Sequence, residues 1–386
     1  MRYKVLDSWR GIAAMFVAAF HFPVNGFVHG TALVRHSWLF VDFFFVLSGF
    51  VIAHALRDGL ADTSAFRAFM VRRLGRVYPL YAVILFAFVA LEAVHAGVQL
   101  FGITTQTPAF APGGLTDPEQ LSRHFTLLQV FGFSDSLSWN WPDWSIAAEV
   151  WTYAVFGIIC LMAFPHRRAL LTGLCALALA IMLERSNRGI EVTYDLGFLR
   201  CLYSFTAGAL VYEAWQRIPF KLTGVLATAC EWVSLLFALA FVMLSGRNAS
   251  SFAAPAVFGL LILTFAFEGG RVSRVLSGGI FQMLGALSYS IYMVHALIVF
   301  CFTLGASAVL TRTINAVWYV ETYDKVSERI LQLPGPLPDA FTCIYLAIVV
   351  LSAAVVWRFI ESPARLKANT WAAQIGTPTG LPASTT

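Results

Sequence analysis

Apolar runs of about twenty residues recur along this chain from one end to the other. As a helix, a run of that length spans the hydrocarbon core of a bilayer, which is about 30 Å thick. Hydrophobic residues make up 59% of the sequence and charged residues 12%, and the mean hydropathy is +0.73. Such a chain has too little polar surface to be solvated by water alone. The sequence therefore predicts an all-α integral membrane protein, a bundle of transmembrane helices.

About ten spans are expected. The apolar runs lie near 10–29, 38–57, 77–97, 144–164, 168–184, 194–214, 223–244, 252–268, 283–305 and 340–360. A further piece, FTLLQVFGF at 125–133, is too short to cross and is expected to lie at the surface or to re-enter. The first run has a cationic flank like a signal peptide. It lacks a small-x-small cleavage site, so we expect it to be retained.

Charge bias sets the expected orientation. With the N-terminus in the cytoplasm, about 17 of the 26 Lys and Arg residues fall on the cytoplasmic side, which predicts that both termini are cytoplasmic. The formal net charge is only +5, so we interpret the basic excess as topology and not as nucleic-acid binding. No linker divides the chain, so residues 1–367 are predicted to form one membrane domain and residues 368–386 a disordered cytoplasmic tail.

The six cysteines lie singly in or beside apolar runs, without a C-x-x-C pair or a histidine cluster. This spacing favours packing residues and predicts neither a disulfide framework nor a metal site.

Two polar residues in the first span stand out. Arg10 and His21 are eleven residues apart, so on a helix they share a face within about 20° and are separated by about 16 Å of rise. Arg10 alone is explained as an anchor at the inner surface. His21 lies near mid-membrane, where a polar side chain is costly unless it faces a partner or a cavity, so a functional role is the default hypothesis.

Carboxylates occur at a similar depth in two other spans. Asp42 lies in VDFFFVLSGF and Glu149 in WSIAAEVWTY. Either one is a candidate to hold the His21 ring in one tautomer and to stabilise its protonated form. The alternative for both is a buried hydrogen bond or a favourable charge at a helix N-terminus.

Basic and aromatic residues complete the polar set. Arg73 and Arg76, in RRLGRVYPLY just before the third span, share a helix face and suit phosphate groups, although plain topology anchoring explains them equally well. In the ninth span, LSYSIYMVH places Ser288, Tyr292 and His295 on one stripe. A second mid-membrane imidazole again points to a polar path.

Taken in order, these segments resemble the acyltransferase-3 family of membrane acyltransferases. The resemblance is carried by LDSWRGIAAMFVAAFH with its R-x10-H spacing, VDFFFVLSGF, RRLGRVYPLY, WSIAAEVWTY, LGALSYSIYMVH and FIESPAR, across residues 6–365. The extra hydrolase-like domain of some longer members has no counterpart here, so a standalone transferase of the bacterial inner membrane is expected.

The resemblance implies transfer of an acyl group, most often acetyl, from acyl-CoA to a hydroxyl of a glycan or lipid-linked saccharide. Acetyl-CoA would be a co-substrate, and no tightly bound cofactor is implied. His21 would act as general base or carry the acyl group. The remaining site residues are predicted as follows: Asp42 and Glu149 in catalysis, Arg10, Arg73 and Arg76 on the CoA phosphates, and Trp144, Ser145, Tyr289, Tyr292 and His295 in substrate binding or structural support.

Two other functions remain open from the residues alone. A transporter or flippase would use the buried histidines and carboxylates as a proton relay, and a non-catalytic subunit of a membrane assembly would need neither. The acceptor, the choice of acetyl over succinyl or longer donors, and the oligomeric state are left open.

Overall fold

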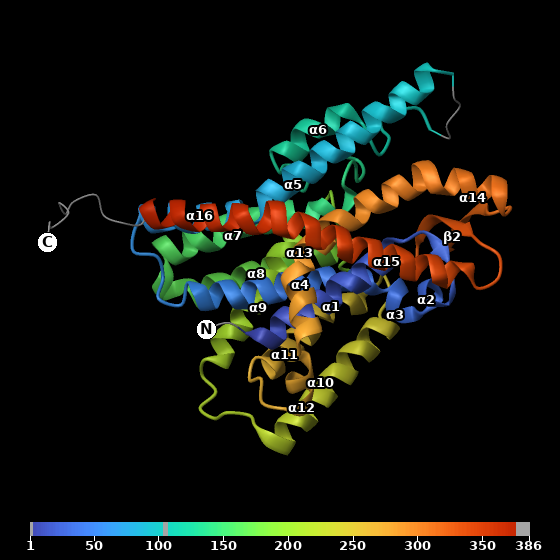
Figure 1. Cartoon of the computed structure of the whole chain (residues 1–386). Coiled ribbons are helices and arrows are strands. Elements are labelled where there is room, and N and C mark those ends of the chain that lie inside the picture. Colours follow the sequence, from blue (N-terminus) through green and yellow to red (C-terminus); the bar gives the residue numbers. More distant parts are fainter. Residues whose placement is uncertain (1–2, 103–106, 376–386) are drawn as a thin grey trace, which may run out of the picture.

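The computed structural model describes residues 3–102 and 107–375 of the chain, and this part is almost wholly helical (Figure 1). Within it, seven helical segments are long and apolar enough to cross a membrane. These are Ser37–Ala55, Thr63–Leu100, Trp141–Met162, Phe164–Arg185, Gly224–Leu244, Gly279–Thr313 and Leu337–Ile375. The expected all-α membrane protein is confirmed.

Each of the ten expected spans overlaps one of ten helices. They are α1 Lys4–His21, α4 Phe40–Ala55, α5 Thr63–Leu100, α7 Trp144–Met162, α8 Arg167–Arg185, α9 Gly197–Trp215, α10 Gly224–Leu244, α11 Ala254–Phe265, α13 Gly279–Cys301 and α15 Leu337–Val356. Helices α1, α9 and α11 fall outside the seven long apolar segments. Charged residues interrupt α1 and α9, and α11 has 12 residues. The number of crossings therefore stays a prediction.

The remaining α-helices connect these ten or, in the case of α16, follow α15. They are α2 Phe27–Gly30, α3 Ala32–Arg35, α6 Pro118–Phe125, α12 Arg271–Leu276, α14 Ser307–Thr313 and α16 Ser362–Ile375. The helix α6 ends at Phe125, and the apolar piece after it forms turns, as a segment too short to cross should. Residues 368–375, expected to be disordered, continue α16 and pack on α5, where Ala368 meets Gly75. The rest of that tail lies outside the described residues.

A small sheet was not expected from the sequence. Strands β2 Val317–Tyr323 and β3 Val326–Gln332 form a hairpin, and β3 also pairs in parallel with β1 Val24–Asn25. Strand β1 follows directly after α1, and Leu331 N donates to Pro23 O at 2.8 Å. The hairpin is thereby fixed to the end of α1 that carries His21.

Close contact between α1 and α13 depends on two glycines. A Cβ atom on Gly11 would collide with the backbone of Leu284, and one on Gly285 would collide with the backbone of Asp7. Without side chains at these points the two helices can touch backbone to backbone, as small residues permit in membrane bundles. This contact brings the polar residues of α1 next to those of α13.

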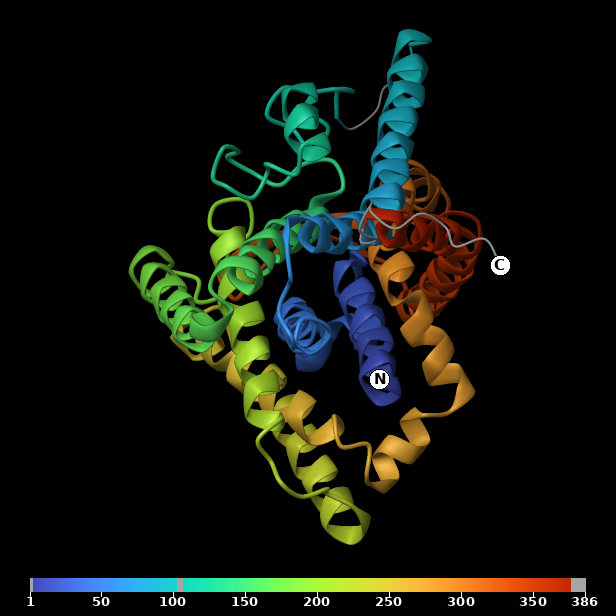
Figure 2. The same ribbon diagram turned by 90° about the vertical axis from the view of Figure 1, so that its left-hand side faces the viewer.

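The elements surround a central pair of helices. Seen from the side of the chain termini, α1 and α4 lie in the middle with the other long helices around them (Figure 2). In Figure 1 the start of α1 and the end of α16 point to the left, whereas the hairpin lies at the right. We call these the terminal end and the hairpin end of the molecule.

Candidate active site

Several polar contacts join α1 and α13, and two of them involve predicted site residues. The Arg10 guanidinium donates through Nη2 to Ser288 Oγ at 2.9 Å. Further along the same helices, His21 Nδ1 lies 3.1 Å from His295 Nε2. The stripe of α13 that the sequence singled out therefore faces α1, and its histidine meets the first one directly.

The His21 ring has one occupied and one free nitrogen. Its Nδ1 lies 3.0 Å from Val17 O, one turn back on α1, and it also faces His295. A single Nδ1 proton can be shared between that carbonyl and His295 Nε2, because both can act as acceptors. Among the described residues Nε2 has no hydrogen-bond partner, so its lone pair is available. His295 is fully buried, whereas His21 remains partly exposed.

His21 lines a cavity of about 760 Å³, which we call the histidine cavity. Its walls come from the end of α1, from the 186–196 loop and from the hairpin, so it lies toward the hairpin end. Four tryptophans line it, namely Trp38, Trp141, Trp144 and Trp318, and so do four arginines, Arg188, Arg200, Arg247 and Arg329. The Trp141 ring lies edge-on to the His21 ring, with centroids 6.4 Å apart. Aromatic walls with a few charged groups are typical of a site for an organic ligand.

A second, smaller cavity of about 110 Å³ lies beside the first, and we call it the arginine cavity. Arg10, Arg73 and Arg76 all line it, from α1 and α5. The guanidinium of Arg73 lies over the rings of Phe69 at 5.5 Å and Tyr153 at 6.0 Å. Its Nε is buried without a hydrogen-bond partner. Its position just before the third span predicts a surface side chain, but the two rings leave Arg73 only partly exposed.

Tyr292 and Val41 line both cavities, so they form the partition between them. The Tyr292 hydroxyl donates to Pro142 O at 2.8 Å and lies 2.7 Å from Ser145 Oγ. Its ring is 5.5 Å from the ring of His295. Two of the predicted support residues, Ser145 and Tyr292, thus act together in holding the partition.

Two more of the five predicted support residues, Trp144 and Tyr289, lie on either side of it. Trp144 lines the histidine cavity, and Tyr289 lines the arginine cavity while its hydroxyl donates to Val77 O at 2.6 Å.

Neither predicted carboxylate touches the His21 ring. Asp42 forms a buried ion pair with Arg200, whose Nη2 lies 2.7 Å from Oδ2, and it accepts from Ser204 Oγ at 2.9 Å. The approach of α4 to α9 allows this, because a Cβ atom on Gly49 or Gly208 would collide with the facing backbone. Asp42 therefore points toward α9, and its partner differs from the one proposed from the sequence.

Glu149 belongs to the arginine cavity. It accepts a hydrogen bond from the Tyr153 hydroxyl at 2.6 Å, and Tyr153 lies 3.0 Å from Ser48 Oγ. This row of polar groups lines the path between the arginines and the partition. The sequence predicted a carboxylate as the neighbour of the His21 ring. The side chain that lies next to the ring is instead that of His295.

Sequence reasoning missed Arg200, Arg247 and Trp141. Arg200 had a visible signal, because a charge inside an expected apolar span needs a partner. Arg247 and Trp141 come from connecting segments, and no periodic pattern indicates that these segments fold over the end of α1.

The fold and the paired cavities define a polytopic membrane protein with two adjacent cavities inside its helix bundle. The chain belongs to the acyltransferase-3 family: the family profile described as an acyltransferase domain matches residues 3–357. It is therefore a membrane acyltransferase by family.

Two curated relatives share part of the chain. Protein 2 in the picA locus of Rhizobium radiobacter is 33% identical over 165 residues, which are 40% of this chain and 81% of that protein. Acyltransferase MdmB of Streptomyces mycarofaciens is 31% identical over 165 residues, which are 40% of this chain and 38% of that protein. No solved structure matches the chain.

Proposed function

We propose that this protein transfers an acyl group, with acetyl as the reference donor, from acyl-CoA to a saccharide hydroxyl. The acyl-CoA would enter the arginine cavity from the cytoplasm, and the acceptor, a glycan or lipid-linked saccharide, would enter the histidine cavity from the other side of the membrane. The observation that carries this proposal is that His21, whose Nε2 is free, lines one cavity while a cluster of arginines lines the cavity next to it.

The arginine cavity offers guanidinium groups to the phosphates of the donor. CoA phosphates need guanidinium groups with unused donors, and Arg73 has a buried Nε without a partner. An extended phosphopantetheine arm is about 15–20 Å long, comparable to the rise of about 16 Å between Arg10 and His21. Phosphates held near Arg10, Arg73 and Arg76 would thus let the thioester reach past Tyr292 toward His21.

The histidine arrangement fits a general base. His21 Nε2 would take the proton of the acceptor hydroxyl while the oxygen attacks the thioester carbonyl. The carbon–sulfur bond then breaks, and the imidazolium returns the proton to the departing CoA thiolate. Val17 O and His295 Nε2 both accept from Nδ1, so they stabilise the positive ring during transfer. An acyl–imidazole intermediate on Nε2 is the covalent variant of the same chemistry.

The donor part of this proposal is tested by exchanging single arginines. Purified protein is incubated with radiolabelled acetyl-CoA, and both CoA binding and transfer to saccharide are measured. Arg73→Gln should weaken CoA binding by about tenfold or more, since a charge-assisted hydrogen bond contributes about 1.5–3 kcal/mol. Arg72→Gln is the matched control, because Arg72 neighbours it on α5 without lining the cavity.

Equal CoA affinity in both variants would remove the phosphate role from Arg73. Uptake of saccharide into proteoliposomes without any CoA would favour a transporter and contradict the transfer reaction.

A further inference from the structure

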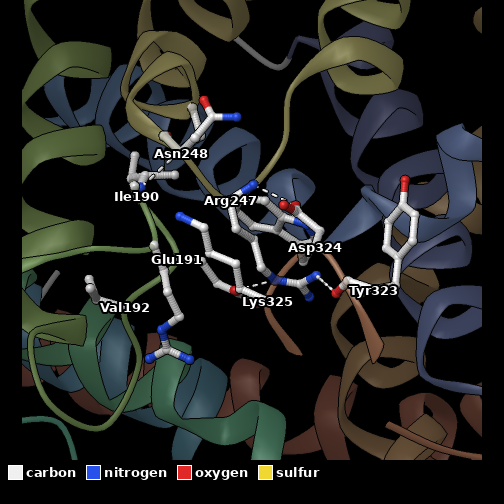
Figure 3. A network of polar contacts seen from close by, with 12 residues as sticks. Ile190, Glu191, Val192, Arg247, Asn248, Tyr323, Asp324 and Lys325 are labelled. Atoms are coloured by element: carbon white, nitrogen blue, oxygen red, sulfur yellow. Dashed lines mark hydrogen bonds and ion pairs between the residues drawn. The ribbon is translucent and has the colours of Figure 1, made fainter. Parts of the chain in front are cut away.

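Three chain segments are tied together around Arg247 at the histidine cavity. Its guanidinium forms an ion pair with Glu191 of the 186–196 loop, and Nη1 lies 3.5 Å from Tyr323 O of the hairpin. Its backbone N–H donates to Asp324. Figure 3 shows Arg247 between these two segments. Because Arg247 is only 2% exposed and its charge is paired with Glu191, its main role is to hold the cavity wall in place.

The ion pairs leave an excess of positive charge in this cavity. Arg247 is neutralised by Glu191 and Arg200 by Asp42. The other two arginines that line the cavity, Arg188 and Arg329, have no ion-pair partner within residues 3–102 and 107–375.

One further acid, Glu328, also lines the cavity. Burial raises the pKa of its carboxyl above the usual value and so favours the neutral form. It therefore cancels little of the excess charge.

The two unpaired arginines come from different walls. Arg188 lies in the loop after α8, and Arg329 lies on β3, where its guanidinium sits 5.2 Å from the centre of the Trp318 ring. This cation–π contact orients Arg329 without neutralising its charge. Trp318 and Trp141 line the same cavity and give it aromatic surface that suits a ring-shaped ligand. Such walls suit a ligand that combines an apolar ring face with a negative charge.

We propose that the histidine cavity selects an acceptor that carries an anionic group, and that Arg188 and Arg329 bind this group while the hydroxyl to be acylated faces His21. This inference rests on the proposed function for the identity of the reaction. The anionic group is a carboxylate or a phosphate, because both accept hydrogen bonds from guanidinium groups in the same way.

Three probes that differ at one position test the proposal. Methyl glucoside is neutral, methyl glucuronide carries a carboxylate at C6, and methyl glucoside 6-phosphate carries a phosphate at C6. Binding to the protein in nanodiscs is followed by tryptophan fluorescence, with saturating CoA present to occupy the arginine cavity. We expect at least one anionic probe to bind about tenfold or more tightly than the neutral one, with a preference that weakens as salt is added. Which of the two binds more tightly distinguishes carboxylate from phosphate recognition.

Single substitutions test whether Arg188 and Arg329 cause the preference for an anionic probe. Arg188→Gln and Arg329→Gln should each lower the affinity for the anionic probe about fivefold or more and leave methyl glucoside binding unchanged. Glu328→Gln should preserve or raise that affinity, because it removes an acid from the cavity. Arg185→Gln is the matched control: Arg185 is exposed at the end of α8, three residues before Arg188, and does not line the cavity.

Equal binding of neutral and anionic probes, or an equal loss in Arg185→Gln, would overturn the proposal. A parallel assay with radiolabelled acetyl-CoA separates the two levels of inference. If methyl glucoside is acetylated at least as fast as both anionic probes, the cavity does not select for charge. The proposed acyltransferase function would still hold. A clear anionic preference in binding, with no ester formed on any probe, would sink the proposed reaction and leave the anion site in place.

Discussion

At the scale of single residues, the central feature is a pair of histidines with unequal roles. His21 keeps a free Nε2 on a large cavity, whereas His295 is fully buried behind it and faces its Nδ1. A base must reach the proton it removes, so geometry favours His21 over His295. In the proposed mechanism, His295 would act through His21, by fixing its tautomer and sharing its proton.

We therefore predict different outcomes for the two glutamine variants. His21→Gln should lower transfer by about 10²–10⁴-fold and leave CoA binding nearly intact, because an amide cannot take a proton at neutral pH. His295→Gln should keep measurable turnover, since its amide oxygen can still accept from His21 Nδ1. Transfer of label from acetyl-CoA measures both, and His166→Gln, an exposed histidine in the connection between α7 and α8, is the control.

The reverse result, an active His21→Gln beside an inactive His295→Gln, would move the base to α13.

Asp42 offers a second prediction at this scale. Because it pairs with Arg200 in a buried position, Asp42→Asn should destabilise the protein by about 3–5 kcal/mol, as removal of one partner from a buried ion pair does. Replacing Arg200 by Met in the same chain should recover part of that loss. Thermal unfolding in detergent measures both, and a stable but inactive Asp42→Asn would instead assign this carboxylate to the reaction.

At the scale of elements, helix contacts explain why some site residues were predictable and others were not. The R-x10-H spacing placed Arg10 and His21 on one face of a single helix, which helical geometry alone requires. The partner of each side chain depends on which helices touch, and that is decided by backbone contacts such as Gly11 with α13 and Gly49 with α9. Sequence spacing carries no information about those neighbours.

The same limit applies to the hairpin. Its second strand, β3, pairs with the two-residue strand β1 after α1, so this register depends on contacts between residues about three hundred positions apart. A periodic pattern read within one segment cannot predict this pairing. The sequence therefore contains the charged residues of the histidine cavity but does not indicate that they line one cavity.

A glycine exchange tests the contact between α1 and α13. Gly285→Ala places a Cβ against the backbone of Asp7, so the helices must separate, and overpacking of this kind costs about 1–3 kcal/mol. We expect a lower unfolding temperature and a weaker transfer activity, since Arg10 and Ser288 lie beside this contact. Gly279→Ala on the same helix is the control, because a Cβ there meets no atom within 4 Å. Equal unfolding temperatures would show that the contact is looser than the structure indicates.

At the scale of the whole molecule, the two cavities make the two ends of the protein different. The arginine cavity and the histidine cavity lie on opposite sides of Tyr292, and the hairpin borders only the latter. A reaction that uses CoA from the cytoplasm and a saccharide from outside needs this separation, because the bilayer keeps the two substrates apart. The proposed orientation therefore has a direct consequence for which surfaces can be reached from each side.

The last prediction concerns that orientation. In a variant without native cysteines, Lys325→Cys at the hairpin tip should react with a membrane-impermeant thiol reagent in intact cells. His166→Cys, between α7 and α8, should react only after the membrane is opened. Both positions are accessible, since Lys325 and His166 are exposed. The physical basis is the charge bias, because about 17 of the 26 Lys and Arg residues lie on the side assigned to the cytoplasm. If His166→Cys reacts in intact cells and Lys325→Cys does not, the predicted orientation across the membrane is reversed. The arginine cavity would then open to the side that lacks CoA.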